Sequence, residues 1–250
     1  MRFLLAFIVI FFAKNTFGQS AQIDSLQQLI AKEGETKRKV ELLTQLSFNL
    51  FSYDIEIAGN MAQSAIVLAQ KINDRKGEGW AKAYRGVYFL FSGNLSEANF
   101  FAKNSLQMAQ RVQDSNLQAY SLNQLANVFR DRGIFDSAFY FYRLAEKVPS
   151  DLFYTSVVRM NKARCFLILN KPDSALAEVK EVITLRNTLF GNRAMPDVWL
   201  VLANCHRQKS ELQEAEKYFE LVLNRFLCRL ERRGLAIPIT MLSTTRPTLR

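Results

Sequence analysis

Apolar residues recur at helical spacing along the chain from residue 20 to about residue 225, where the pattern decays. Five Pro and ten Gly are few for 250 residues, and almost all other residues in this stretch tolerate a helix well. At its start, four apolar residues share one helix face: Ile23, Leu26, Leu29 and Ile30. The pattern predicts an all-α protein that begins with a capping helix within residues 19–36.

A second pattern, with a period close to forty residues, overlies the helical one. Residues 69–74 read AQKIND and residues 109–114 read AQRVQD, a conservative echo. Two columns of mostly small residues follow the same period, namely Leu46, Gly86, Ala126, Ala163 and Ala203, and, twelve residues later in each case, Ala58, Ala98, Ala138, Ala175 and Ala215. Small residues at two matched positions let paired helices approach closely. We therefore predict about five helix–turn–helix repeats over residues 37–224.

One unit, residues 122–149, carries the repeat pattern most completely. Its large apolar, small, aromatic and turn positions are Leu122, Leu125, Ala126, Phe129, Gly133, Ala138, Tyr142 and Ala145. This order resembles the tetratricopeptide repeat, which implies a right-handed α-solenoid. The units that begin near Arg38 and Ser156 match less well, with Gln45 and Lys162 where Leu is expected.

The period of about forty residues is longer than the usual 34 of this repeat. The extra residues fall where the second helix runs on through the AQKIND and AQRVQD phrases. The long-helix variant is similar to the repeat arrays found in front of bacterial sensor kinases and regulators.

The N-terminal segment differs from the repeats. A basic start, an unbroken apolar run at residues 3–13, and the small residues Thr16 and Gly18 predict a signal peptide over residues 1–18 that is cut after Gly18. The mature protein is then periplasmic or secreted; an uncleaved anchor is the alternative. No other apolar run approaches about 18 residues, so we expect no stable membrane span in the mature chain.

The C-terminal segment also departs from the repeat. The sequence predicts an irregular basic tail over residues 225–250, with Pro238 and Pro247 and a cluster of Thr and Ser. We hypothesise that the reading frame is truncated or shifted near Leu227, leaving a disordered end.

The net charge of +10 lies mainly at the two ends of the chain. Residues 1–18 carry +2 and residues 225–250 carry +5, which leaves +3 for the body. A body with so small a charge lacks the basic surface that nucleic-acid binding needs. We therefore expect no nucleic-acid partner.

Few residues could carry chemistry. His206 shares its column with Phe129 and Phe166, which indicates a packing position, and one His cannot form a metal site with these cysteines alone. Cys165 and Cys205 occupy one apolar column and are predicted to be small buried hydrophobes. Motifs of phosphate-binding loops, zinc proteases and serine hydrolases are absent from the sequence. We predict no catalytic residue, metal or cofactor; an enzyme whose site the sequence does not reveal is the alternative.

The resemblance places the first helix of each repeat along a concave groove. The candidate peptide-binding residues there are Asn123, Asn127, Arg130, Arg164, Asn204 and Arg207. Asn can bind a peptide backbone through a donor and an acceptor, and Arg can bind a carboxylate in a fork. Because Ser47 and Val87 replace Asn in the first two repeats, the predicted surface is confined to the last three. The expected ligand is an extended, acidic or carboxylate-ended segment, and the alternative is a groove that is merely solvated.

These patterns together predict an exported, non-enzymatic scaffold that binds a protein or an extended peptide. The alternative is a truncated extracytoplasmic sensory domain of a signalling receptor of the histidine kinase or transcriptional regulator type. The patterns do not predict the oligomeric state.

Overall fold

The computed structural model describes residues 21–51, 53–191 and 195–231. Every regular element in these ranges is an α-helix: α2 (Ala21–Lys32), α3 (Lys37–Leu50), α4 (Ile55–Lys71), α5 (Arg75–Phe91), α6 (Leu95–Arg111), α7 (Ser115–Asp131), α8 (Phe135–Lys147), α9 (Leu152–Ile168), α10 (Pro172–Phe190), α11 (Pro196–Gln208) and α12 (Leu212–Glu231). After α2, the helices pair consecutively into five units, from α3 with α4 to α11 with α12. The prediction of an all-α array of five helix pairs is confirmed.

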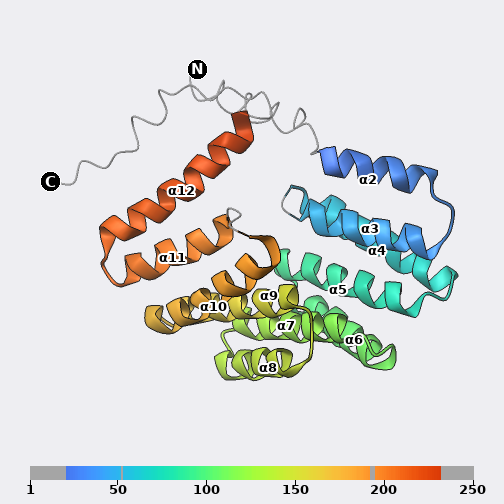
Figure 1. The fold of residues 1–250 in the computed structure, drawn as a ribbon. Coiled ribbons are helices and arrows are strands. Elements are labelled where there is room, and N and C mark those ends of the chain that lie inside the picture. Colours follow the sequence, from blue (N-terminus) through green and yellow to red (C-terminus); the bar gives the residue numbers. More distant parts are fainter. Residues whose placement is uncertain (1–20, 52, 192–194, 232–250) are drawn as a thin grey trace, which may run out of the picture.

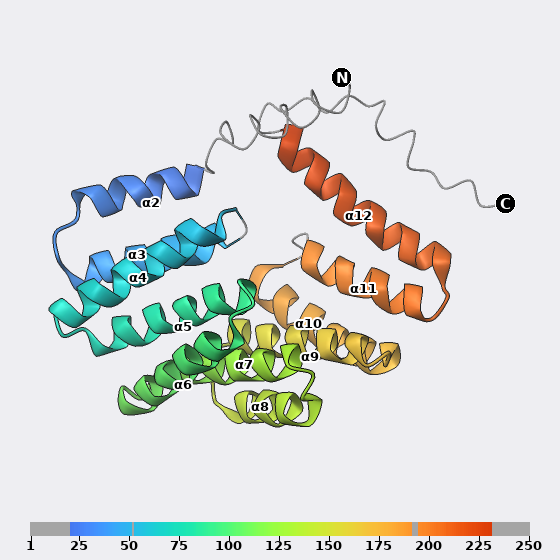
Figure 2. The same cartoon turned by 180° about the vertical axis from the view of Figure 1, so that it is seen from behind.

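The helix pairs stack into an arc (Figures 1 and 2). The helices α2 and α12 lie on its two arms, and α7 and α8 lie at its middle. Each pair contacts the next, so the core is a row of apolar clusters between consecutive helices rather than one central core. This arrangement is typical of a solenoid.

The predicted columns of small residues lie at the helix contacts. The later column is almost fully buried: Ala58, Ala98, Ala138, Ala175 and Ala215 are each 0–4 % exposed. In the earlier column, a Cβ atom on Gly86 would lie 3.3 Å from the Cβ atom of Phe101 on the neighbouring helix. Larger side chains at these positions would push the helices apart, because protein interiors leave little free volume.

The AQKIND and AQRVQD phrases end one helix and begin the next. Asn73 and Gln113 have φ angles of 56° and 53°, the left-handed conformation that stops a helix. Asp74 and Asp114 follow directly and cap α5 and α7, since each carboxylate accepts a hydrogen bond from the backbone N–H three residues ahead. The repeated phrase therefore encodes a helix stop followed by a helix start.

Lys162 lies at a position where the repeat pattern expects Leu, and it connects three helices. Its ammonium nitrogen lies 3.0 Å from a carboxylate oxygen of Glu146 on α8 and 2.8 Å from one of Glu178 on α10. Arg159 on α9 also binds Glu178, at 2.9 Å. The weak match to the repeat pattern thus marks an ion-pair cluster between α8, α9 and α10.

The last helix runs further than the sequence predicted. α12 continues to Glu231, whereas the irregular tail was predicted to start at Arg225. Residues 225–231 contain neither Pro nor Gly, so no helix breaker stops α12 earlier. The predicted signal peptide and residues 232–250 lie outside the described residues. Among the helices that are described, none is both long and apolar enough to cross a membrane.

Candidate functional site

The concave side of the arc holds a cavity of about 940 Å³, here called the groove cavity. Its wall comes mainly from α3, α5, α7 and α9, the first helices of four consecutive repeats, with one residue each from α10 and α11. This volume lies in the range of ordinary ligand sites. The wall has an apolar half and a polar half.

The part of the wall from the first two repeats is here called the apolar half. It consists of Phe48, Phe51, Tyr53, Val87, Leu90 and Phe91. Further apolar wall residues come from α9, namely Phe153, Val157, Met160, Leu167 and Ile168. Phe91 is 68 % exposed and Phe48 is 45 % exposed, although both are large and apolar. The ring of Phe91 stacks on that of Phe51, with centroids 6.2 Å apart. An apolar group of this size on a concave surface is typical of a binding site.

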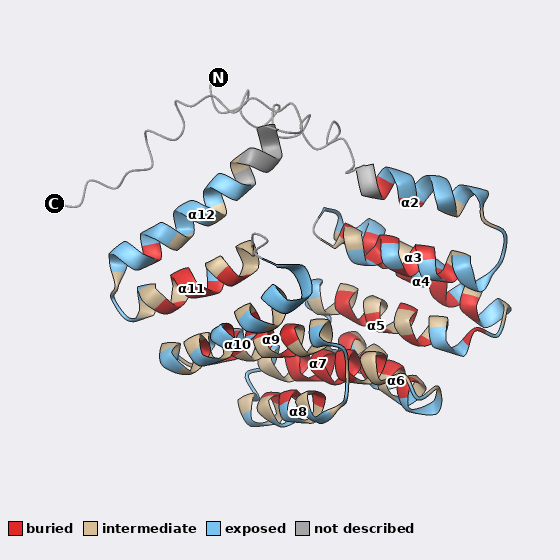
Figure 3. Ribbon diagram, in the orientation of Figure 1, coloured by how far each residue is buried: buried red, intermediate tan, exposed pale blue. Residues whose placement is uncertain are grey.

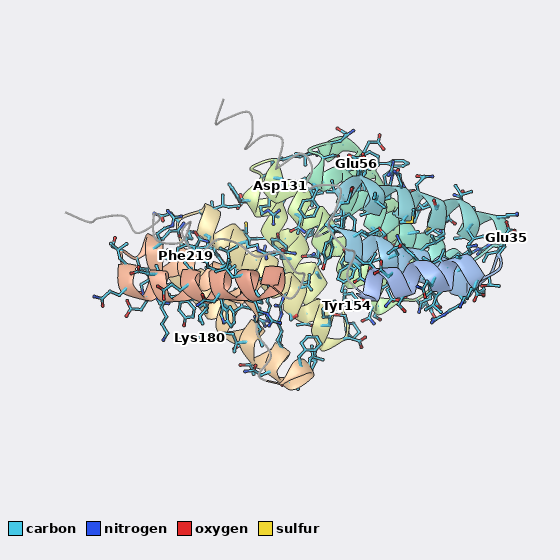
Figure 4. All side chains as sticks on the ribbon, turned by 90° about the horizontal axis from the view of Figure 1, so that it is seen from above. Glu35, Glu56, Asp131, Tyr154, Lys180 and Phe219 are labelled. Atoms are coloured by element: carbon cyan, nitrogen blue, oxygen red, sulfur yellow. The ribbon has the colours of Figure 1, made fainter. Side chains whose placement is uncertain are left out.

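The polar half comes mainly from α7 and α9. It consists of Asn123, Asn127, Arg130, Asp131, Asn161, Arg164, Arg186 and Asp197. Arg130 binds Asp131 and Arg186 binds Asp197, both at 2.7 Å. Figure 4 looks down onto the arc and labels Asp131 in this half. Two of its three Arg side chains are therefore neutralised by a carboxylate.

Arg164 is the third cation of the polar half. None of the ion pairs among the described residues includes it, and its hydrogen bond goes to the neutral Oδ1 of Asn161, at 3.0 Å. The side chain is exposed to the cavity but surrounded by protein atoms. This loss of hydration, with the nearby positive charges of Arg130 and Arg186, lowers its pKa, although Asp197 opposes the shift. A guanidinium pKa that is somewhat lowered still leaves the group charged at neutral pH. Arg164 is thus positioned to bind an anion.

Asn127 has a structural role in the wall of the groove cavity. It is 6 % exposed, and its Oδ1 accepts hydrogen bonds from the hydroxyl of Tyr142, at 2.7 Å, and from Arg130, at 3.1 Å. The Asn127 acceptor, which the sequence prediction assigns to a ligand backbone, is therefore already engaged within the protein. The acceptor instead ties α7 to α8.

Asn123 lies one helical turn before Asn127 and is 1 % exposed. Its Oδ1 accepts a hydrogen bond from Asn161 on α9, at 3.1 Å. Its own amide nitrogen is buried and has no hydrogen-bond partner among the described residues. Because an unpaired buried donor is costly, this nitrogen is a position where a water molecule or a ligand oxygen would stabilise the wall.

The structure brings together four of the six predicted groove residues, all on α7 and α9. Asn204 and Arg207 do not line the cavity. They lie on α11, where Arg207 is exposed and donates to Asn204 at 3.2 Å. The groove cavity therefore spans the first four repeats rather than the last three.

The sequence prediction missed Asn161 and the whole apolar half. Asn161 could have been found from the spacing Asn-x-x-Arg, which occurs at residues 127–130, 161–164 and 204–207. Part of the apolar half could have been found from the columns that lie one, four and five residues after the small residue of each first helix, without requiring polar residues there. Those columns hold Val87, Leu90 and Phe91 in the second repeat.

His206, Cys165 and Cys205 have packing roles, as predicted. The ring of His206 stacks on Tyr218 at 5.5 Å, and its Nδ1 lies 2.6 Å from Glu211. Cys165 and Cys205 are buried and free, and burial raises the pKa of both thiols to about 11. Such thiols are poor nucleophiles at neutral pH. Within the described part of the chain, no three His, Cys, Asp or Glu side chains are grouped to hold a metal ion.

Comparison with known proteins supports the fold. No family model matches the sequence, and no curated protein matches it. The crystal structure of BtubC (BKLC) from P. vanneervenii is similar, with a TM-score of 0.54, 16 % identity, and 92 % of each chain covered. TPR-like repeats of a kinesin light chain from Podosopora anserina match at a TM-score of 0.48 and 13 % identity, over 76 % of this chain and 96 % of that chain. The likeness to BtubC, together with the five helix pairs, confirms a tetratricopeptide-like solenoid.

Proposed function

We propose that this tetratricopeptide-like solenoid is a non-enzymatic scaffold whose groove cavity binds an extended segment of a protein or peptide. The observation that carries the proposal is Arg164, a charged group in a concave cavity without a carboxylate partner among the described residues. An unpaired guanidinium favours a ligand carboxylate because the two can form a paired, charge-assisted hydrogen bond. The ligand is therefore a segment with an acidic residue or a terminal carboxylate.

The proposal includes that this protein catalyses no reaction. The thiols of Cys165 and Cys205 are buried and protonated, and the His206 ring is stacked and hydrogen-bonded. The described wall of the cavity offers no nucleophile beside a base. The wall instead offers Asn, Arg and aromatic side chains, which bind without reacting.

A peptide-display selection tests the proposal. Random peptides are selected on the full chain and then measured with an Arg164→Glu variant. We expect selected peptides to be rich in Asp or Glu and to bind the variant at least about tenfold more weakly, as loss of a charged hydrogen bond implies. Arg143→Glu is the matched control, because Arg143 is an exposed cation on α8 outside the cavity. Equal weakening by both variants, or selected peptides without acidic residues, would contradict the proposal.

We also propose that the protein is exported and loses residues 1–18. The support is the apolar run at residues 3–13 with the small residues Thr16 and Gly18 behind it. Intact-mass measurement of the protein from a soluble extracytoplasmic fraction should give a chain that begins at Gln19. A chain that retains Met1 and sediments with membranes would contradict this.

A further inference from the structure

The outer face of α12 carries a stripe of exposed apolar residues. Leu212 is 59 % exposed, Phe219 is 37 % exposed and Leu223 is 42 % exposed. Residues spaced by seven and then four positions fall on one side of a helix. Figure 4 shows Phe219 at the opposite end of the solenoid from Glu35, and Figure 3 shows much of α12 as exposed. This surface is here called the end face.

The same column is buried in every earlier repeat. Phe219 lies four residues after Ala215, and the residues four after the corresponding alanines are Ala62, Ala102, Tyr142 and Val179. Each of these four is at most 1 % exposed. The column three residues before these alanines shows the same difference. Leu212 is exposed, whereas the corresponding residues of the earlier repeats are partly buried, namely Ile55, Leu95, Phe135 and Pro172. The end face is thus a repeat-to-repeat contact surface that no described residue covers.

The earlier repeats show what kind of element fits this surface. Val179 and Val182 of α10 pack in one cluster with Val198 and Cys205 of α11. The residues on α11 lie seven positions apart, on one face of the helix. The helix that covers α10 therefore presents an apolar stripe to it.

The charges beside the apolar stripe indicate which kind of helix is complementary to the end face. Glu216 and Glu220 lie one helical turn from residues of the stripe, along one edge of it. In the earlier repeats the Glu216 column holds the uncharged residues Gly59, Asn99, Phe139 and Leu176. The end face therefore differs from the internal contact surfaces by an acidic edge, and a complementary helix has Lys or Arg along the facing edge.

A second copy of the chain fits this edge poorly. An antiparallel two-fold pairing of α12 with itself places each acidic edge against the other, because a two-fold interface uses the same patch twice. Like charges at such an edge oppose association.

We propose that the end face docks an amphipathic helix of a partner protein, which has an apolar stripe and a basic edge. The docked helix takes the place of the first helix of a further repeat. It covers Phe219 and Leu223 and pairs its cations with Glu216 and Glu220. This site is separate from the groove cavity, so the two can be occupied at the same time.

A synthetic helix tests the proposal by fluorescence anisotropy on the full chain. The probe is a labelled peptide of about 18 residues, long enough to span α12, with Leu on one face and Lys along one edge. We expect Phe219→Glu to weaken binding by at least about tenfold, and Leu221→Glu to change it by less than about twofold. Leu221 is a matched control because it is 36 % exposed and lies on the opposite side of the same helix. Circular dichroism shows whether both variants remain folded.

Three results would overturn the proposal. The first is a wild-type chain that fails to bind the probe at about 100 µM, a concentration at which weak helix docking is measurable. The second is an equal preference for a probe with Glu in place of Lys, because the acidic edge would then play no part. The third is a dimer in sedimentation velocity that Phe219→Glu dissociates and Leu221→Glu does not, because the occupant would then be a second copy.

Discussion

Asn127 shows how a groove residue can carry stability. Because its Oδ1 accepts from Tyr142 and Arg130 while it is 6 % exposed, Asn127→Ala leaves two donors without an acceptor. We expect the variant to lose about 1–3 kcal/mol of unfolding free energy in urea denaturation. Asn204→Ala is the control, since Asn204 bonds only within its own helix and should lose less than about 0.5 kcal/mol. Equal losses would mean that the Tyr142 bond contributes little.

The buried thiols give a second test at this scale. Burial raises the pKa of Cys165 and Cys205 to about 11, so at pH 8 only about one thiol in a thousand is ionised. We expect iodoacetamide to leave both residues unmodified in the native protein and to label both in urea, as read by peptide mass mapping. Rapid labelling of either one in native buffer would contradict the burial of that repeat contact.

The turns between repeats set the length of each helix. Gln113 adopts a φ angle of 53°, which costs an L-residue other than Gly or Asn free energy because of its Cβ atom. We expect Gln113→Gly to raise the unfolding free energy by up to about 1 kcal/mol. Asn73→Gly is the matched control at the same point of the preceding turn, and the gain there should be smaller because Asn tolerates this conformation. If Gln113→Gly instead lowered the unfolding free energy, the positive φ angle of Gln113 would not be a source of strain in the native turn.

Asp114 caps α7 and contacts α5, and its ionisation makes the free energy of unfolding depend on pH. Burial opposes its ionisation, but hydrogen bonds from the Leu117 N–H, from Lys76 and from Trp80 outweigh burial and lower its pKa. A carboxyl whose folded pKa is below its unfolded value stabilises the fold above the unfolded pKa, and that contribution is lost as the pH falls through the folded pKa.

The corresponding variant is Asp114→Ala. It should lose about 1–2 kcal/mol at pH 7, a typical value for a helix cap, and the difference from wild type should shrink below about pH 4. Asp54→Ala removes a cap that has no Lys or Trp partner among the described residues, so its loss at pH 7 should be smaller. A difference between Asp114→Ala and wild type that stays constant from pH 7 to pH 3 would contradict the role of the charge.

The repeat architecture of the whole molecule could be predicted from the sequence, whereas the groove could be predicted only in part. The columns of small residues specify helix contacts, and helix contacts repeat at the same positions in every unit. The positions that line the groove cavity do not repeat in every unit. Val87 lines the cavity in the second repeat, whereas Asn204, at the equivalent position of the fifth repeat, does not. Which units face the cavity depends on the curvature of the arc, and curvature accumulates from small rotations that no single column records.

The central claim is that ligands occupy the concave side of the arc. Hydroxyl-radical footprinting of the full chain with a selected peptide tests it directly, because exposed aromatic residues lie on both sides. Phe91 and Phe48 line the groove cavity and are 68 % and 45 % exposed, while Phe100 and Tyr140 lie on the second helices α6 and α8 and are 57 % and 52 % exposed. We expect the peptide to protect Phe91 and Phe48 from oxidation and to leave Phe100 and Tyr140 unchanged. Protection of Phe100 and Tyr140 instead would show that the ligand binds the convex side, and the account of the groove would be wrong.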